Sequence, residues 1–548
     1  MQPVTRGAHS RHDAAAIVYT VIVVAGLGLG LALACMPVET SLSHFLIDDM
    51  FYYLTTARNV LAGMGASLDG IHATNGFHPL WMLMLAGITF LTGGAPFLTV
   101  HLALGLALFF HWLSIGLLVV SVHRFLGSLP ALAVAALLTF NYRLSSIPLG
   151  GLETALAGAM VMLVTVFYAF GRPLETTRGA VRLGLLLGFT FLARFDTLLF
   201  GLILLAFAAF SGGNGTEARR RLVMTSIAGT VALAICLPWF AFSLRMTGEL
   251  LPASGEAIAA WGGDPWRSVS SPLQAVKTLL SLLNPAANDL CNVFGLSPWV
   301  LRKGPASRVA APVMGIVATA LMAIAWGQRR SPAVRRLAWV PVYAGLHVSY
   351  YVWFGHALFR YFYPLLFPVL VFAAAVVSST VRPQAATPLW GRRALLVMPL
   401  LLITVSALSG LEAFRLGVAD GPFHGLHLAL YEAATWISRQ TPPDSVIGSF
   451  NAGTISYFSK RRTVNLDGAM NYSVIPAIRG RCIADYIRAN GITHLADVES
   501  QLDTIMDDFS GEAEWPRTYQ EVFAIDGTFH GDRRLRIVVL RRENPLAP

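Results

Sequence analysis

Long apolar runs are the feature of this sequence that most restricts its fold. An α-helix needs about 20 apolar residues to cross the hydrocarbon of a bilayer, and about twelve runs approach that length. They lie at residues 14–36, 77–93, 97–122, 130–148, 152–170, 180–193, 195–211, 222–243, 309–327, 336–354, 361–380 and 394–413. Only 13% of all residues are charged, against about 25% in soluble domains. We therefore exclude a soluble enzyme, a disordered chain and a coiled coil, and predict a polytopic α-helical membrane protein with about 11–13 transmembrane helices.

Arginine clusters between these runs set the predicted orientation. They lie near 172–182, 219–221, 329–336 and 382–393, and the positive-inside rule places such loops in the cytoplasm together with the N-terminus. The first loop (37–76), the long loop (244–308) and everything after about 414 are then on the outer face. The net charge of +10 is accounted for by these loops, so nucleic acid is not an expected partner.

The number of crossings must be odd for this orientation. We therefore expect one run between 77 and 148 to be re-entrant or broken, and 130–148 is the first candidate because Asn141, Tyr142 and Arg143 interrupt it. Only three of the 40 basic residues are lysine, which favours a GC-rich bacterial genome and hence the bacterial cytoplasmic membrane.

The composition changes after residue 413, where acids and turn residues become common. We divide the chain into a transmembrane domain, 1–413, and an extracytoplasmic α/β domain, 414–548. The pattern of the second domain predicts helices at 427–439 and 481–490. Strands are expected at 445–450, 463–466, 492–497, 519–526 and 534–541.

Two adjacent carboxylates, Asp48 and Asp49, begin a helical pattern in the first loop. Apolar residues recur there at helical spacing, which indicates an amphipathic helix lying at the membrane surface. A carboxylate held where a lipid headgroup meets water can take the proton of an acceptor hydroxyl. The alternative is structural, because aspartate is also a good helix N-cap.

Further polar clusters fall on the same predicted face. They contain Glu153, Arg194 with Asp196, Ser254, and a group made of His356, Arg360, Tyr361 and Tyr363. Charged side chains at membrane depth are costly and usually functional, and two arginines suit a phosphate. Each cluster also has a structural alternative: an Arg194–Asp196 ion pair, a Glu153 cap, or an interfacial anchor at Arg360.

A divalent-metal site is a second open question. Asp48, Asp49 and His78 share the first loop, but their spacing matches no known ligand pattern, so we assign no cofactor. Neither a phosphate-binding glycine-rich loop nor a nucleophile elbow is present, which argues against an ATP-driven pump.

In their order along the chain, these motifs resemble the GT-C superfamily of polytopic glycosyltransferases. The matching segments are Asp-Asp-x-Phe-Tyr-Tyr (48–53), Thr-Asn-Gly-Phe-His-Pro-Leu-Trp (74–81), Gly-Leu-Glu-Thr-Ala-Leu (151–156), Leu-Ala-Arg-x-Asp (192–196) and Leu-Pro-x-Ser (251–254). The protein mannosyltransferase-like and arabinofuranosyltransferase-like branches are the most similar. Segments 449–453 and 465–471 of the outer domain also fit.

The resemblance implies an inverting transfer of a sugar from a polyprenyl-phosphate donor to a hydroxyl of a glycan, lipid or protein. It implies that Asp48 or Asp49 is the catalytic base and that Arg194 and Arg360 bind the donor phosphate, with Tyr361 or His356 assisting. The expected substrate-binding residues are Asn75, His78, Glu153, Asp196 and Ser254.

This sequence also departs from the family pattern. Gly76-Phe77-His78 is inserted where the arabinofuranosyltransferase-like motif reads Tyr-Thr-Asn-Pro-Leu-Trp, and Glu256-Ala257 stands where a lysine is frequent. Two other functions stay open. One is a secondary transporter or lipid flippase, although no internal repeat of the kind such proteins contain is visible. The other is a non-catalytic scaffold for envelope assembly.

Overall fold

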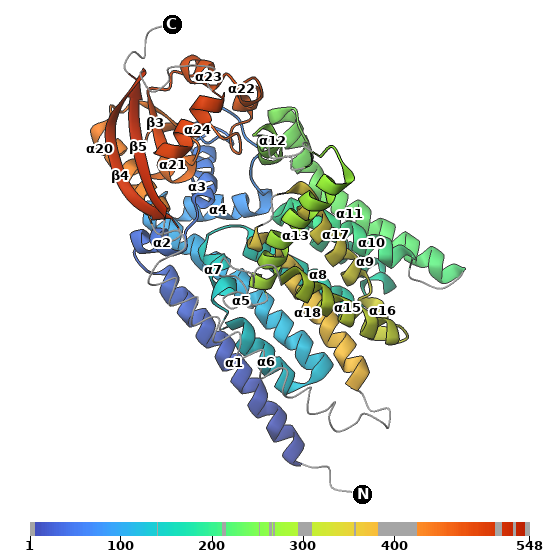
Figure 1. Ribbon diagram of the computed structural model, residues 1–548. Coiled ribbons are helices and arrows are strands. Elements are labelled where there is room, and N and C mark those ends of the chain that lie inside the picture. Colours follow the sequence, from blue (N-terminus) through green and yellow to red (C-terminus); the bar gives the residue numbers. More distant parts are fainter. Residues whose placement is uncertain are drawn as a thin grey trace, which may run out of the picture.

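The computed structural model describes residues 6–139, 141–210, 215–250, 252–261, 266, 269–293, 310–355, 358–381, 425–509, 518–529 and 533–542. Figure 1 shows a body of helices with a smaller sheet domain at one end. Five helices of the described part are long and apolar enough to cross a membrane. They are α1 (Arg6–Ala34), α5 (Pro96–Leu126), α8 (Thr154–Gly171), α11 (Thr216–Thr247) and α18 (Phe359–Val381).

Further helices stand beside these five. They are α4 (Pro79–Leu91), α6 (Ser128–Thr139), α9 (Thr177–Ala193), α10 (Leu198–Phe210), α13 (Pro272–Val293), α15 (Ala310–Gly327) and α17 (Trp339–Phe354). All but α13 coincide with predicted runs. The chain is thus a multi-pass helical membrane protein, as predicted. The run expected at 394–413 and the domain boundary at 413–414 lie outside the described residues.

The interruption predicted in the run 130–148 is present. Helix α6 ends at Thr139, and α7 (Tyr142–Leu149) begins three residues later. The Asn141 side chain accepts a hydrogen bond from the backbone N–H of Leu144, at 3.2 Å. Asparagine is a preferred N-cap because its side chain satisfies a free N–H of the first turn. This residue therefore starts a new helix instead of continuing the old one.

The sheet domain contains five strands in the order β2-β1-β3-β5-β4. Strands β1 (Val446–Ser449), β2 (Arg462–Asn465) and β3 (His494–Val498) are parallel, whereas β5 (Arg533–Arg542) is antiparallel to both β3 and β4 (Tyr519–Phe529). All five strands were predicted from the sequence.

Helices cover both faces of this sheet. Apolar residues of α20 (Leu426–Gln440) and α21 (Ala452–Phe458) pack on one face. Those of α22 (Ile475–Arg479), α23 (Ile483–Ala489) and α24 (Glu499–Phe509) pack on the other. Strand β3 is buried along its whole length, as expected for a strand covered on both faces. Helices α20 and α23 match the predicted helices, whereas α21 and α24 were not predicted.

The first loop and the long loop both lie against the sheet domain. The first loop contains α2 (Val38–His44) and α3 (Asp48–Leu61), and the long loop contains α12 (Ala253–Ala260) and α13. Figure 1 shows α3 beneath the sheet domain and next to α4. The Phe51 ring of α3 lies 5.4 Å from the Tyr457 ring and 5.1 Å from the Phe458 ring, both in α21.

This position differs from the predicted amphipathic helix on the membrane surface. Ten of the fourteen residues of α3 are buried, because α4 covers one side and α21 the other. The polar residues Tyr52, Thr55 and Thr56 are among the buried ones.

Candidate active site at the junction of the two domains

Asp48 is used to hold the two domains together. Its side chain is buried at 5% exposure. Its Oδ2 accepts a hydrogen bond from the backbone N–H of Gly453 at 2.9 Å, and its Oδ1 accepts one from Thr454 at 2.7 Å. These N–H groups belong to the first turn of α21, which has no side-chain cap of its own. Asp48 therefore caps a helix that lies about 400 residues further along the chain.

Other residues of α3 extend this contact. The Tyr52 hydroxyl donates to the carbonyl of Phe450 at 3.1 Å and accepts from the N–H of Ala452 at 3.2 Å. The Arg58 guanidinium donates to the carbonyls of Ser456 and Tyr457 at 3.2 and 3.3 Å. Burial raises the pKa of the Asp48 carboxyl to about 6, while its bonds to α21 act in the opposite direction. This set of bonds joins Asp48 and the rest of α3 to α21.

Asp49 has a different environment from its neighbour. Its side chain is 43% exposed, and its Oδ2 accepts a hydrogen bond from the Arg360 guanidinium at 2.9 Å. Arg360 itself is 17% exposed and lies with its guanidinium carbon 5.5 Å from the centre of the Tyr361 ring. Asp49 thus combines a nearby cation with access from outside. Of the two adjacent acids, it is the one that a substrate can reach.

Arg194 forms the centre of a buried ionic network next to this pair. It donates to Glu153 Oε1 at 2.7 Å and to both carboxylate oxygens of Asp196 at 3.0 Å. The Tyr351 hydroxyl donates to the same Asp196 carboxylate. The Arg194 guanidinium carbon also lies 4.7 Å from the centre of the Tyr361 ring. These acids raise the pKa of Arg194 against the effect of its burial, so its charge is permanent and already compensated.

Glu153 and His78 connect this network to α3. The Tyr53 hydroxyl donates to Glu153 Oε2 at 3.1 Å and accepts from the backbone N–H of His78 at 3.2 Å. The His78 Nε2 lies 3.5 Å from Glu153 Oε1. Although burial acts to raise the pKa of Glu153, the charges of His78 and Arg194 lower it. Glu153 is therefore an ionised partner of Arg194, which the cap interpretation did not anticipate.

Asn75 is also fully engaged. Its amide donates to the hydroxyls of Ser243 at 2.8 Å and Thr247 at 3.1 Å, and its carbonyl accepts from the N–H of Ala253 at 2.9 Å. It therefore joins the first loop to α11 and to the start of α12, where Ser254 lies partly exposed. Both the NH2 group and the carbonyl oxygen of this buried amide are thus bonded to other segments of the chain.

The three inserted residues of the first loop each fill a defined place. A Cβ atom on Gly76 would lie 2.0 Å from the carbonyl oxygen of Ala469, so only glycine permits this approach to the sheet domain. The Phe77 ring packs on Trp239 at 5.4 Å, and the His78 ring packs on Phe195 at 4.7 Å. The insertion thus contacts the sheet domain through Gly76 and the helical body through Phe77 and His78.

Two acids of the sheet domain, not predicted as site residues, lie at the carboxyl ends of its parallel strands. Asp497 is the second-to-last residue of β3 and accepts hydrogen bonds from the Ser449 hydroxyl and from the backbone N–H groups of Phe450 and Asn451. Asp467 follows β2, and its pKa is raised to about 7 by burial and, to a smaller extent, by the charges of Asp49 and Asp48. Parallel sheets commonly bind ligands at this edge, and here the edge faces α3.

The predicted metal ligands do not come together. His78 pairs with Glu153, Asp48 with α21 and Asp49 with Arg360. Within the described ranges, no three His, Cys, Asp or Glu side chains are placed to hold a metal ion. These residues do not fit a metal site, and we derive no step through one. His356 lies outside the described residues.

Comparison with known proteins gives the fold. No curated protein matches the sequence. A family described as a domain of unknown function, DUF8728, matches residues 424–540, which is the sheet domain. Among solved structures, ArnT from Cupriavidus metallidurans bound to undecaprenyl phosphate is 14% identical with a TM-score of 0.54, over 96% of this chain and 99% of that one.

An archaeal enzyme is similar to the same degree. The Archaeoglobus fulgidus oligosaccharyltransferase in its apo form is 13% identical with a TM-score of 0.57, over 95% of this chain and 76% of that one. Its complex with zinc and sulfate gives a TM-score of 0.55 at 13% identity, over 93% and 72% of the two chains. At such identities the likeness concerns the fold alone, and it confirms the predicted GT-C fold.

Proposed function

We propose that this protein is a membrane glycosyltransferase that moves a sugar from a polyprenyl-phosphate donor to an acceptor hydroxyl, with inversion at the anomeric carbon. The observation that carries the proposal is the partly exposed Asp49–Arg360 pair, which lies beside a buried network of charges in a chain with the GT-C fold. The undecaprenyl phosphate bound by the similar ArnT supports a lipid-phosphate donor.

Asp49 is the proposed general base. It takes the proton of the acceptor hydroxyl, and the resulting oxygen attacks the anomeric carbon from the side opposite the phosphate. The bond between the anomeric carbon and the phosphate oxygen breaks, and polyprenyl phosphate leaves with the electron pair. Because this phosphate is already a good leaving group, the reaction needs little help from a general acid.

Arg360 is the proposed ligand of the donor phosphate. In the structure its charge neutralises Asp49 at 2.9 Å. When a donor phosphate binds, Arg360 exchanges the carboxylate for the phosphate, so the base becomes free at the moment when substrate is present. A guanidinium at this position also stabilises the negative charge that grows on the leaving phosphate. Tyr361, next in the chain, helps to fix the position of this arginine.

Arg194 takes a positioning role in this proposal. Two of its three nitrogens already donate to Glu153 and Asp196, which leaves it little capacity for a phosphate. It holds Glu153 and Tyr361 in place and, through them, His78 and Arg360. Asp48 likewise positions its neighbour Asp49 by anchoring the start of α3 to the sheet domain. We place the whole site on the outer face of a bacterial cytoplasmic membrane, where the sheet domain helps to orient the acceptor.

The test is a transfer assay on purified protein in detergent. It uses a panel of radiolabelled polyprenyl-phosphate sugars, a membrane extract as acceptor, and parallel reactions with EDTA. The variants are Asp49→Asn, Asp48→Asn and, as a matched control, Asp485→Asn, because Asp485 is a 68% exposed surface acid. Loss of a general base costs about 10²–10⁴-fold in rate. We expect that loss for Asp49→Asn, with unchanged thermal unfolding.

Asp48→Asn is expected to lower the thermal stability first and the rate only as a consequence. If folded Asp49→Asn protein keeps the wild-type rate, the base assignment is wrong. If no donor in the panel is transferred or hydrolysed, the glycosyltransferase proposal gives way to a transporter or scaffold function.

A further inference from the structure

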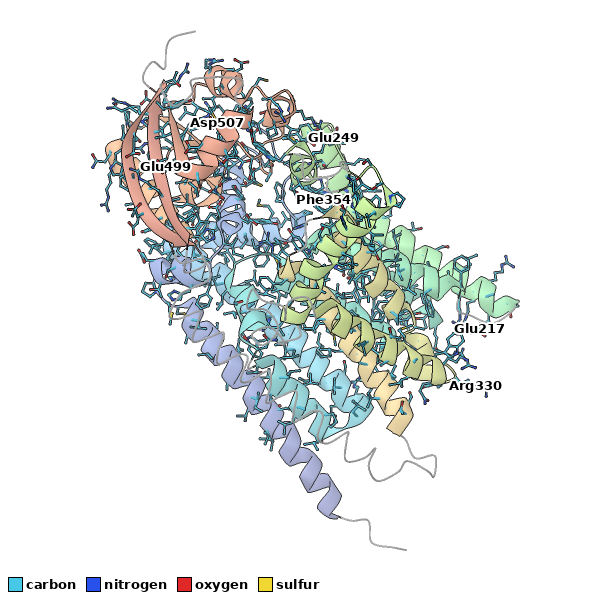
Figure 2. The ribbon with its side chains drawn as sticks, viewed as in Figure 1. Glu217, Glu249, Arg330, Phe354, Glu499 and Asp507 are labelled. Carbon is cyan, nitrogen blue, oxygen red and sulfur yellow. The ribbon has the colours of Figure 1, made fainter. Side chains whose placement is uncertain are left out.

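The end of the helical body far from the sheet domain contains a cavity of about 520 Å³. Figure 2 shows this end through the labels Glu217 and Arg330, opposite Glu499 and Asp507 of the sheet domain. The cavity is formed by the connection between α8 and α9, the start of α11, the end of α15, and α16 (Pro332–Arg336). Its lining includes six arginines, which define what we call the arginine cavity: Arg172, Arg220, Arg221, Arg329, Arg335 and Arg336.

The charges of the arginine cavity are not balanced. Among the described residues only two acids line it, and each pairs with one arginine: Glu175 accepts from Arg172 at 3.3 Å and Glu217 from Arg221 at 2.8 Å. Four positive charges remain around one space. Like charges held this close repel one another, so an anion in the cavity would relieve the repulsion.

Two of the four remaining arginines have protein partners. Arg336 donates to the carbonyl of Ala169 at 2.7 Å, and the Arg329 guanidinium carbon lies 5.0 Å from the centre of the Trp326 ring. Within the part of the chain that the structure describes, the side chains of Arg220 and Arg335 form no hydrogen bond or ion pair. Both side chains are exposed, and their donors are therefore available to a ligand.

One side of the cavity is apolar. Phe207 of α10, Phe372 of α18, and Met322 and Trp326 of α15 contribute to the lining. Met322 is 47% exposed and Trp326 is 71% exposed. Exposed apolar side chains on a helix of a membrane protein face lipid chains. The cavity therefore offers cations at one end and a lipid-facing wall at the other, which matches an amphipathic anion.

Orientation in the membrane alone does not account for this arrangement. The positive-inside rule requires basic residues in the loops, but it does not require that they converge. Here three segments that are far apart in the sequence bring their arginines to one space, and two neighbouring arginines, Arg219 and Arg330, lie outside the lining. The number of basic residues in these loops and their gathering around one cavity are therefore two different properties, which variants can test separately.

We propose that the arginine cavity binds the phosphate group of an anionic lipid, with the lipid chains along the α15 wall. Guanidinium groups bind phosphate oxygens through paired, charge-assisted hydrogen bonds. The site is independent of the transfer reaction proposed above and lies at the opposite end of the molecule.

The experiment uses the purified full-length chain in a neutral detergent. Binding of dioctanoyl phosphatidylglycerol, dioctanoyl phosphatidylcholine and inorganic phosphate is measured by native mass spectrometry and by the shift in thermal unfolding. The test variant is Arg220→Gln/Arg335→Gln. The matched control is Arg219→Gln/Arg330→Gln, which removes the same charge from the same two segments but from outside the lining. All four side chains are exposed, so neither variant removes a packed residue.

We expect phosphatidylglycerol to bind the wild type at least about tenfold more tightly than phosphatidylcholine. Loss of two charge-assisted contacts should weaken that binding by about tenfold or more in the test variant and leave it unchanged in the control. Equal loss in both variants, or no loss in either, would overturn the site. If inorganic phosphate stabilises the wild type as well as the lipid does, the cavity binds free phosphate and the lipid assignment is overturned.

Discussion

Gly453→Ala tests whether Asp48 joins the two domains as described. Gly453 lies in α21 and does not have a positive φ, so alanine is compatible with its backbone. In an open helix this change would stabilise the protein by about 0.5–1 kcal/mol. Here a Cβ atom would lie 2.2 Å from the Asp48 carbonyl oxygen and 2.8 Å from its Oδ2. Because of this contact with Asp48, we expect Gly453→Ala to destabilise the protein instead of stabilising it.

The size of the effect follows from the same geometry. Real Cβ contacts essentially never fall below 3.0 Å, so α21 must move away by about 0.8 Å. The bonds from Gly453 and Thr454 to Asp48, now 2.9 and 2.7 Å, would then reach or exceed the limit at which hydrogen bonds are lost. Bonds to charged groups contribute about 1.5–3 kcal/mol each. Partial relaxation reduces the sum, and we expect about 2–4 kcal/mol of destabilisation.

Two measurements check this prediction. Thermal unfolding in detergent reports the stability, and hydrogen exchange with mass spectrometry reports the amides of α21 and the start of α3. Exchange should rise there, while β3 and β5 keep their protection. Gly255→Ala is the control, because a Cβ atom on Gly255 meets no atom within 4 Å. If Gly453→Ala is as stable as the wild type with unchanged exchange, the contact between Asp48 and α21 does not exist as described.

Two further predictions concern other charges. Glu153→Gln should lower the stability by about 3 kcal/mol because it leaves part of a buried Arg194 charge uncompensated. The matched control is Glu175→Gln, because Glu175 pairs with Arg172 at the exposed surface. It should lower the stability by under about 1 kcal/mol. Equal shifts in thermal unfolding for the two variants would contradict the buried network. Asp69 accepts hydrogen bonds from His72 that lower its pKa to about 2 even though its burial acts in the opposite direction. A folded pKa below the unfolded value gives stability that is present above pH 4 and lost as the pH falls toward 2. Asp69→Asn should make the stability less dependent on pH in that window. If the stability of the variant falls at acid pH as steeply as that of the wild type, the prediction is refuted.

The sequence predicted the elements better than it predicted their partners. The strands of the sheet domain were recognised because short β-branched runs such as Val446-Ile447 and Ile537-Val538-Val539 stand out in a polar segment. Asn141 marked a helix break because its capping preference is local. Helix α21 was missed because it is short and its cap, Asp48, comes from a distant part of the chain. No local pattern records such a cap.

The same difference between local patterns and distant partners applies to the candidate site. The sequence identified Asp49 from its place at the start of a loop helix, and Glu153, Arg194, Asp196 and Arg360 from the cost of charges at membrane depth. The structure brings all five into one region. The sequence did not reveal that Asp48 and Asn75 are used internally, because their partners belong to other segments. The two-sided burial of α3 was also hidden, since hydroxyl-bearing residues such as Tyr52 and Thr55 give the same pattern on a wet face as beneath another domain.

The hydrogen bonds between α3 and α21 can form only late in the synthesis of the chain. The bonded residues are separated by about 400 positions, for instance 405 between Asp48 and Gly453. At about 5–20 residues per second, a ribosome needs roughly 20–80 s to make the intervening chain. During that interval α3 has reached or crossed the membrane, but α21 does not yet cover its Phe51 and Tyr52 side chains. Each nascent molecule therefore passes through a stage in which this face is open to chaperones and proteases, and the late arrival of α21 closes it.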